Sequence, residues 1–207
     1  LGKRRKVRHL QGRARFLDGG TLEVDTGEGN GTRLSFENAI LATGSRPARL
    51  PFLPDSERVM DSAAALELPE IPPRLLVIGG GYIGLELGTF YAAMGSRVTV
   101  VEMTGGLLPG VDADLVRPLS KRLEGRLESI RLKTRVVEVE QKKEKLRVTF
   151  EGENAPDGPR EFDRLLFSVG RKPNTEELGL DSTAVRVGED GFVEVDAQMR
   201  TGEASIY

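Results

Sequence analysis

The sequence predicts an α/β fold with three layers, in which a parallel sheet is combined with an antiparallel β hairpin or meander. The first observation is an apolar strand, Arg74–Ile78, followed by a glycine turn, an apolar helix and a second strand, a β-α-β unit of about 30 residues. The second is the run "KLRVTFEG", in which Leu146, Val148 and Phe150 alternate with polar residues. Parallel strands need a helical crossover, whereas a hairpin joins antiparallel neighbours, so the chain is expected to contain both kinds of sheet.

The composition indicates a soluble, cytoplasmic globular protein. The chain has 207 residues, 38% of them hydrophobic, and a formal net charge of -2. No run approaches the roughly 18 apolar residues of a membrane span, so neither a membrane nor a nucleic acid is an expected partner. With no cysteine and one histidine, His9, we expect no disulfide, no thiolate nucleophile and no metal site.

The first fifteen residues, "LGKRRKVRHLQGRAR", are strongly basic. A nucleic-acid arm or a transit peptide are alternative interpretations, but no aromatic or amphipathic pattern accompanies the charge. The chain starts without methionine and stops abruptly at "EASIY", so we expect a fragment of a longer protein.

The amino-terminal region reads as short strands separated by glycine-rich turns, which predicts an antiparallel meander over residues 7–10, 13–17, 21–25 and 33–36. "NAILATG", residues 38–44, then predicts a buried strand that runs into a glycine. The following "SRPARLPFLP" holds three prolines in ten residues and is typical of an extended connection.

The β-α-β unit continues with a helix over Tyr82–Met94, which Gly95 would cap, and a strand over residues 97–102. Further strands are predicted over residues 134–141 and 145–152, which form a hairpin, over 163–170, which is buried, and over 191–196.

A second helix is predicted from Asp112, a plausible N-cap, with Leu115, Leu119 and Leu123 on one face. Pro118 inside this helix would cost about 3 kcal/mol, so we expect a kink or a late start.

Two segments of the chain resemble each other. "FENAILATGSRP" (Phe36–Pro47) and "FDRLLFSVGRKP" (Phe162–Pro173) match at their first and last residues, at the apolar positions and at Gly44 and Gly170, with a spacing of 126 residues. That spacing is too long for a solenoid repeat but suits the closing strands of two related sheet domains.

The spacing Gly79-x-Gly81-x-x-Gly84 between a strand and a helix predicts a dinucleotide site. The first glycine allows a tight turn, the second lets a pyrophosphate approach the backbone, and the third lets the helix pack against the strand. Free N–H groups at the helix start suit phosphate. A purely structural glycine turn is the alternative.

Glu102 follows Gly84 by 18 residues and closes the next strand, where an acid can accept hydrogen bonds from the adenosine ribose. A 2′-phosphate would meet a like charge there, and residues 103–105 offer no arginine, so we expect NAD(H) over NADP(H). A solvated strand-end glutamate is the alternative. From the residues alone, Tyr82 suggests only packing and Glu86 only a complement to the helix dipole.

Taken together, "ILATGSRP", "LLVIGGGYIGLELG", "VTVVEM", "VGRKPN" and "VEVDAQMRT...IY" resemble the flavoprotein disulfide reductases (class I pyridine nucleotide-disulfide oxidoreductases), and most closely the dihydrolipoamide dehydrogenases. The resemblance covers nearly the whole chain. It implies an FAD domain interrupted by an inserted Rossmann-like NAD domain, then a dimerisation domain. The implied boundaries are residues 1–46 for part of the FAD domain, 47–71 for a linker, 72–174 for the NAD domain and 175–207 for a return segment.

The resemblance also implies the cofactor contacts, with Glu86 near the nicotinamide and Tyr82 covering its pocket. The implied NAD contacts are Gly79, Gly80, Gly81, Tyr82, Ile83, Gly84, Leu85, Glu86 and Glu102, with backbone contacts at Val136 and Gly170. The implied FAD contacts in the parent are Ala14, through its backbone, and Thr43, Gly44 and Ser45.

Several parts of the family pattern are missing: the first glycine fingerprint, the redox cysteine pair, the acid that grips FAD and the His-Glu acid/base pair. We therefore expect no catalytic residue in this segment. The implied parent is a homodimer that oxidises a dihydrolipoyl protein of a 2-oxo acid dehydrogenase complex and passes electrons through a disulfide and FAD to NAD⁺. The alternatives are a glutathione or mercuric reductase-like flavoprotein, and a nucleotide-binding module without redox activity.

Overall fold

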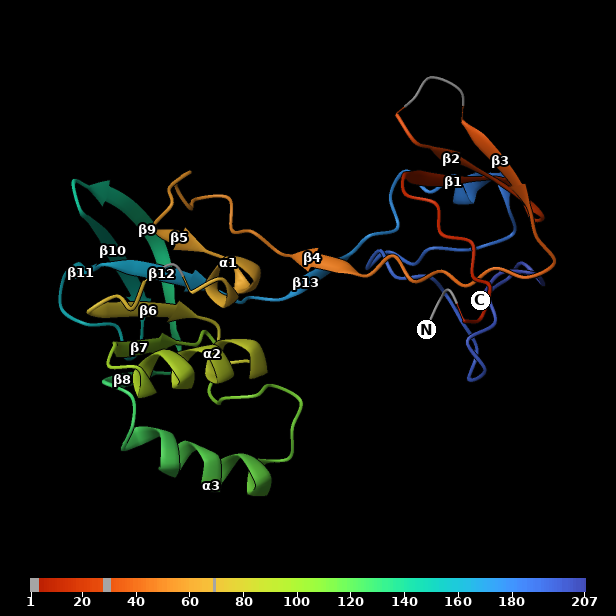
Figure 1. The fold of residues 1–207 in the computed structure, drawn as a ribbon. Helices are drawn as coiled ribbons and strands as arrows, with labels where there is room; N and C mark the ends of the chain where they lie inside the picture. The colour runs from red at the N-terminus through yellow and green to blue at the C-terminus, as the bar shows by residue number, and fades with distance from the viewer. Residues whose placement is uncertain (1–3, 28–30, 69) are drawn as a thin grey trace. The chain divides into compact units, whose positions relative to one another are not determined.

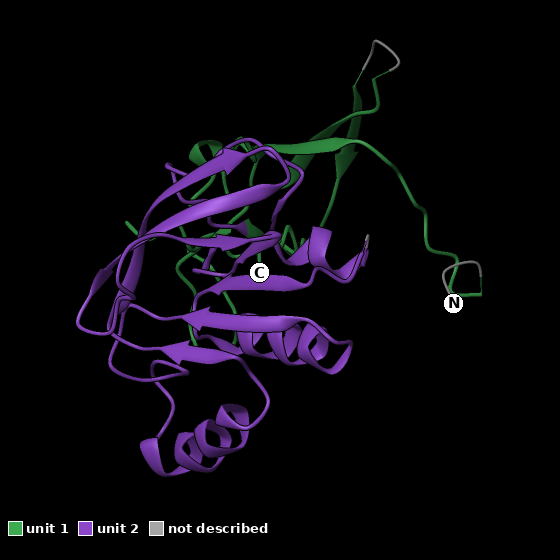
Figure 2. Ribbon diagram, turned by 90° about the vertical axis from the view of Figure 1, so that its left-hand side faces the viewer, with its two compact units in different colours: residues 1–46, 172–207 green, residues 47–171 purple. Residues whose placement is uncertain are grey.

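The computed structural model describes residues 4–27, 31–68 and 70–207 (Figure 1). The chain divides into two compact units (Figure 2). We call residues 47–171 the central unit, and residues 1–46 with 172–207 the discontinuous unit. No helix in the described part of the chain is both long enough and apolar enough to cross a membrane.

The elements occur in the following order along the chain. They are β1 (Arg13–Asp18), β2 (Thr21–Asp25), β3 (Thr32–Ser35), β4 (Ser45–Pro47), β5 (Val59–Met60), α1 (Ser62–Leu66), β6 (Arg74–Ile78), α2 (Tyr82–Ala93), β7 (Arg97–Val101), α3 (Ala113–Glu124), β8 (Ser129–Arg131), β9 (Thr134–Lys142), β10 (Lys145–Gly152), β11 (Arg160–Phe162), β12 (Arg164–Phe167), β13 (Arg171–Pro173) and the 3₁₀ turn η1 (Leu180–Ser182).

The central unit has the predicted three layers. Its middle layer is a parallel sheet with strand order β5-β12-β6-β7-β8. The helices pack against one face of this sheet, and the antiparallel sheet β11-β10-β9 packs against the other. The α/β fold class expected from the sequence is therefore confirmed.

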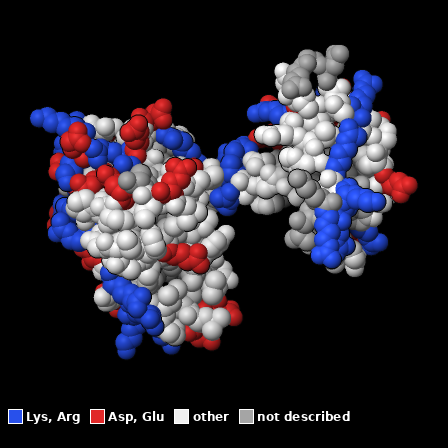
Figure 3. All heavy atoms as spheres, viewed as in Figure 1, with Lys and Arg blue, Asp and Glu red and all other residues white. Residues whose placement is uncertain are grey.

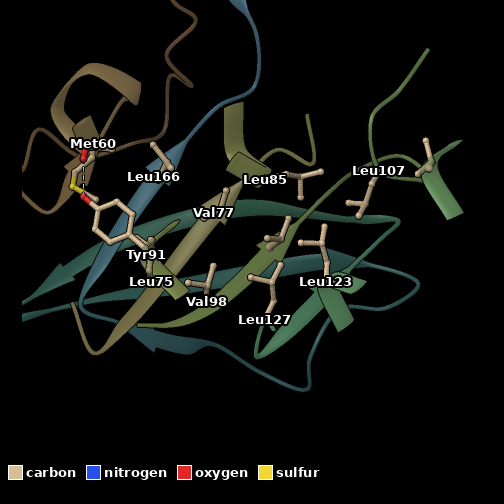
Figure 4. Packing of buried hydrophobic residues seen from close by; sticks show 13 residues of the cluster. Met60, Leu75, Val77, Leu85, Tyr91, Val98, Leu107, Leu123, Leu127 and Leu166 are labelled. Carbon is tan, nitrogen blue, oxygen red and sulfur yellow. Dashed lines mark hydrogen bonds between the residues drawn. The ribbon is translucent and has the colours of Figure 1, made fainter. Parts of the chain in front are cut away.

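Alternation along the parallel strands sends side chains into two separate cores. Leu75 and Val77 of β6 belong to the cluster under the helices (Figure 4), whereas Leu76 and Ile78 belong to the cluster under the antiparallel sheet. Because both faces are covered, β6 is apolar at every position from Leu75 to Ile78 rather than alternating. On the helical side, the buried Tyr91 hydroxyl donates to the Ala65 carbonyl at 2.8 Å, so its polar end is satisfied.

The hairpin predicted from alternation is confirmed. β9 and β10 pair antiparallel, and their inward residues meet the sheet face that carries Leu76. Leu146 and Val148 are fully buried, while Arg147 between them is exposed. This antiparallel sheet therefore closes the central unit on the side opposite α2.

The discontinuous unit contains the meander β1-β2-β3 and a small core that includes Phe16, Leu180 and Ile206. The predicted strands over 13–17, 21–25 and 33–36 are confirmed within a residue or two. The strand predicted over 7–10 is wrong: these residues form no strand, and Val7 is 65% exposed because it packs into no cluster. Residues 1–3 of the basic segment and 28–30 of the turn before β3 lie outside the described residues.

The buried strand predicted over residues 38–44 is also wrong. Ala39 makes a single parallel bridge with Ile206, and Ile40 is 82% exposed, because in the described chain residues 39–41 pair only with residues 205–207. Likewise, residues 191–196 form no strand, since Val193 makes only one bridge, to Val187.

The second helix forms, but its buried face differs from the predicted one. Val116 and Leu123 are buried and Leu119 packs beside them, whereas Leu115 is 66% exposed, since a side chain one position away points about 100° around the helix. The late start is wrong as well, because α3 begins at Ala113 and continues through Pro118. Asp112 occupies the N-cap position without a side-chain cap hydrogen bond.

The connection expected over residues 47–71 contains structure of its own. β5 pairs with β12, and Met60 and Ala65 are buried in the cluster under the helices. Asp61 caps α1 by accepting the Ala64 N–H at 2.9 Å. The sequence reasoning missed these elements because each is too short to show a periodic pattern.

Candidate functional site

The carboxyl ends of three neighbouring strands meet in the central unit. The Gly79 N–H, just after β6, donates to the Val101 carbonyl of β7 at 2.9 Å. On the other side of β6, the Ser168 N–H donates to the Ile78 carbonyl at 2.8 Å. In open α/β sheets, ligands bind in the crevice outside these strand ends.

Each of the three glycines predicted in this crevice meets a different constraint. Gly79 has φ +109, and a Cβ there would collide with the Ser168 carbonyl oxygen. A Cβ on Gly84 would collide with the Gly79 carbonyl oxygen and lie 3.0 Å from Val77, so this glycine lets α2 approach the strand closely. A Cβ on Gly81, by contrast, would meet nothing within 4 Å. The middle glycine therefore borders open space, as the approach of a ligand requires.

Helix α2 starts at the open edge of this loop. Gly81 is its N-cap, supplies no side-chain cap hydrogen bond, and accepts the first helical bond from Leu85 at 3.0 Å. The N–H groups of the first turn point out of the helix end and carry its partial positive charge. These groups are suited to binding phosphate oxygens.

Glu102 lies at the end of β7 and is only 7% exposed. Its Oε2 accepts the Gly80 N–H at 2.7 Å, and its Oε1 accepts the Thr104 N–H at 2.8 Å. The interpretation of Glu102 as a solvated glutamate is therefore wrong. Each carboxylate oxygen has a second lone pair, so Glu102 can brace the glycine loop and still accept a hydroxyl donor.

A cavity of about 640 Å³ opens beside these groups. Five of the predicted contacts line it: Gly79, Gly81, Glu102, Val136 and Gly170. They come from four separate stretches of the chain, which the parallel sheet and β9 bring together. The volume of this cavity is within the range of small-molecule and cofactor sites.

The other predicted NAD residues, all in the described chain, lie outside the lining of this cavity: Gly80, Tyr82, Ile83, Gly84, Leu85 and Glu86. Leu85 is buried in the cluster under the helices, so its side chain points away from the crevice. Tyr82, 63% exposed, and Glu86 lie one turn apart on the same exposed side of α2.

Sequence reasoning missed several groups around the crevice. Ser168 lines the cavity, and its hydroxyl donates to the Ile78 carbonyl at 3.1 Å. Arg135 also lines the cavity, and the side chain of Lys133 runs beside Gly105, with its Cε 3.8 Å from the position of a Cβ on that glycine. The preference for NAD(H) over NADP(H) took into account only residues 103–105, which include no arginine, whereas Lys133 and Arg135 lie about 30 positions later in the sequence, just before and within β9.

The predicted FAD contacts lie in the discontinuous unit. Ala14 is in β1 and lines a cavity of about 450 Å³ with Arg13, Arg15 and Glu23. Gly44 has φ +69, and its carbonyl accepts the Asn174 N–H at 3.0 Å. The Asn174 amide also donates to the Thr43 carbonyl at 3.0 Å. Asn174 therefore holds the turn of Thr43 and Gly44, which continues into Ser45, the first residue of β4.

Comparison with known proteins identifies the family. The sequence model described as pyridine nucleotide-disulphide oxidoreductase matches residues 2–207. This chain belongs to the pyridine nucleotide-disulphide oxidoreductase family. It is 42% identical over 208 residues to the dihydrolipoyl dehydrogenase of Vibrio cholerae, and 40% identical over 207 residues to that of Geobacillus stearothermophilus. These alignments cover all of this chain but 43% and 44% of the two relatives.

Solved structures share the fold of this chain. LpdA from Mycobacterium tuberculosis gives a TM-score of 0.84 at 27% identity, covering 96% of this chain and 44% of that one. The HOCl-induced flavoprotein disulfide reductase RclA from Escherichia coli gives 0.83 at 27% identity, with the same coverage. The resemblance stated from the sequence motifs is thus confirmed, and the chain spans under half the length of these relatives.

Proposed function

We propose that this chain is the NAD(H)-binding portion of a flavin-dependent dihydrolipoamide dehydrogenase. The observation that supports this most directly is the open space at Gly81, which lies between the start of α2 and the buried carboxylate of Glu102. A dinucleotide needs these features together: bare backbone and helix N–H groups for its pyrophosphate, and an acceptor for its ribose hydroxyls.

The roles of the residues follow from their places in the crevice. First-turn N–H groups of α2 would bind the pyrophosphate, and Glu102 would accept from the adenosine ribose while it fixes Gly80. Val136 and Gly170 would contribute backbone contacts from the cavity wall. Tyr82 and Glu86, both exposed, would lie towards the nicotinamide.

In the intact parent, two thiols of a dihydrolipoyl group would lose two electrons and two protons. The electrons would pass by way of an enzyme disulfide and FAD to NAD⁺, which would take up both electrons and one proton as a hydride, while the second proton would be released to solvent. The present chain has no cysteine, so it would bind and orient the nicotinamide coenzyme but not carry out thiol chemistry. Ala14, Thr43, Gly44 and Ser45 would contact FAD. The parent would be a cytoplasmic homodimer that serves a 2-oxo acid dehydrogenase complex.

The test is a titration of the chain with NADH, in which the heat of binding is measured by calorimetry. A Gly81→Val variant should bind NADH at least about tenfold more weakly, because the added side chain would occupy the space of the ligand rather than clash with protein. Gly81 has φ -76, so valine causes no left-handed strain there and the fold should persist.

The matched control is Gly125→Val, at the C-cap of α3. Gly125 has φ -86, and its nearest neighbour to an added Cβ lies 4.0 Å away, so this site is also open, but it does not line the cavity. The control should keep wild-type affinity. Equal NADH affinity of the Gly81→Val and wild-type chains would contradict the proposed site.

A further inference from the structure

The cation Lys133, just before β9, lies beside the turn that follows Glu102. The Lys133 N–H donates to the Thr104 carbonyl at 2.8 Å, and the next N–H, of Thr134, donates to the Glu102 carbonyl at 3.0 Å. The end of the lysine side chain passes Gly105, because its Cε lies 3.8 Å from the position that a Cβ on this glycine would occupy. Lys133 therefore lies beside the segment that carries Glu102, the predicted acceptor for the ribose hydroxyls.

The backbone of Lys133 is held from both sides. Its φ of +50 is left-handed, which is uncommon for a residue other than glycine. Its carbonyl accepts the Glu153 N–H at 3.1 Å and packs so closely on Gly152 that a Cβ there would overlap it. Such strain persists only where the surrounding structure enforces it, so the position of Lys133 is built into the fold.

The charge of Lys133 is neutralised within the same structure. Its Nζ forms an ion pair with Glu153 Oε2 at 2.7 Å, and the two side chains are 53% and 69% exposed. Arg135, two residues further on, pairs in the same way with Glu151 at 2.8 Å across the hairpin. Acidic and basic side chains are similarly interspersed over the face of the central unit seen in Figure 3.

We propose that Glu153 is a specificity-determining residue for the coenzyme, acting together with Glu102. It holds the ammonium group of Lys133 in an ion pair, so that Lys133 is not free to compensate a 2′-phosphate on the adenosine ribose that meets the Glu102 carboxylate. Without Glu153, Lys133 would be available to a phosphate beside this turn. The inference rests on the proposed function, because it assumes that the adenosine ribose lies at Glu102.

The test compares NADH and NADPH binding to the full chain at low ionic strength, with NADPH measured by competition against NADH. Glu153→Gln should tighten NADPH binding about three- to tenfold, the size expected for one freed surface charge, and change NADH binding less than about twofold. Adding sodium chloride should reduce the gain by screening. The double variant Glu153→Gln with Lys133→Gln should lose the gain, because the cation itself is then absent.

The control is Glu140→Gln, which makes the same change of charge in the same hairpin. Glu140 pairs with Lys142 at 3.2 Å at the far end of β9 and does not line the cavity. Unchanged NADPH binding in Glu153→Gln, or an equal gain in Glu140→Gln, would overturn the inference while NADH binding still supports the proposed function. Failure of the wild-type chain to bind NADH would overturn both.

Discussion

The two similar segments, Phe36–Pro47 and Phe162–Pro173, have different structures. Ile40 and Leu166 occupy equivalent positions in the two segments, yet Ile40 is 82% exposed and Leu166 is fully buried. The second segment contains β12, whereas the first contains no strand before β4. Apolar pattern alone therefore does not decide whether a segment becomes a buried strand.

The neighbours of each segment explain the difference. β12 lies between β5 and β6, with parallel partners on both sides, and both of its faces are covered. In the described chain, residues 39–41 have hydrogen-bonding partners on one side only, from residues 205–207. A strand with one neighbour leaves the backbone N–H and C=O groups of its other edge unpaired until a second neighbour supplies partners for them.

The largest expected effect comes from truncating the two equivalent apolar residues. Leu166→Ala should lower the free energy of unfolding by about 2–5 kcal/mol, because it leaves a cavity between the sheet and the helices. Ile40→Ala, at an exposed position, should change it by no more than about 0.5 kcal/mol. Urea denaturation followed by circular dichroism measures both.

Similar losses for the two variants would show that residue 40 is covered in solution, for example by pairing with another copy of the chain. Sedimentation of the wild-type chain at the same concentration shows whether two copies associate. A monomer would mean that the fold is sensitive to any truncation, and a dimer would mean that residue 40 is covered by a second copy.

The second test uses the glycine that both segments share. Gly170 has φ +120 and Gly44 has φ +69, and an added Cβ would find open space at each. Any loss on Gly→Ala substitution should therefore reflect backbone strain alone. We expect about 1–3 kcal/mol for Gly170→Ala and about 1 kcal/mol for Gly44→Ala, since only Gly44 lies near the left-handed well that alanine can occupy. Thermal unfolding of the two variants tests this order, and a larger loss at Gly44 would contradict it.

The smallest effect concerns the equivalent cations Arg46 and Lys172. The hydrogen bond from Arg46 lowers the pKa of Glu176 below its ordinary value of 4.5, and the charge of Lys172 lowers it less. Because folding depresses this pKa, the interaction stabilises the folded chain above pH 4.5 and is lost as the pH falls through the lowered pKa.

An NMR titration of the Glu176 carboxyl carbon should show the pKa returning towards 4.5 in Arg46→Gln, with a smaller rise in Lys172→Gln. Arg46 contacts both carboxylate oxygens, at 2.7 and 2.8 Å, so equal shifts in the two variants would show that this bidentate contact is not maintained in solution.

Much of the central site could be predicted from the sequence, because its glycines are determined locally. Gly79 needs a positive φ, Gly84 lies where a helix touches a strand, and Glu102 directly follows the next strand. The spacing of nearby residues in the sequence is therefore enough to predict all three positions. Ser168 and Lys133 could not be found in this way. Ser168 is held at the crevice by its hydrogen bonds to Ile78, 90 residues away, and Lys133 is held beside the turn after Glu102 by its backbone bond to Thr104, about 30 residues away. No local pattern specifies either partner.

By itself, the sequence determined the glycine loop, the hairpin and the three-layer fold, because turn geometry and side-chain alternation depend on neighbouring residues. Only the tertiary structure decided which apolar segments became strands, which face of α3 was buried, and that a paired lysine lies beside the turn that follows Glu102. The reason is that hydrogen-bond partners, cover and counter-charges come from distant parts of the chain, and burial depends on them as much as on the residue itself.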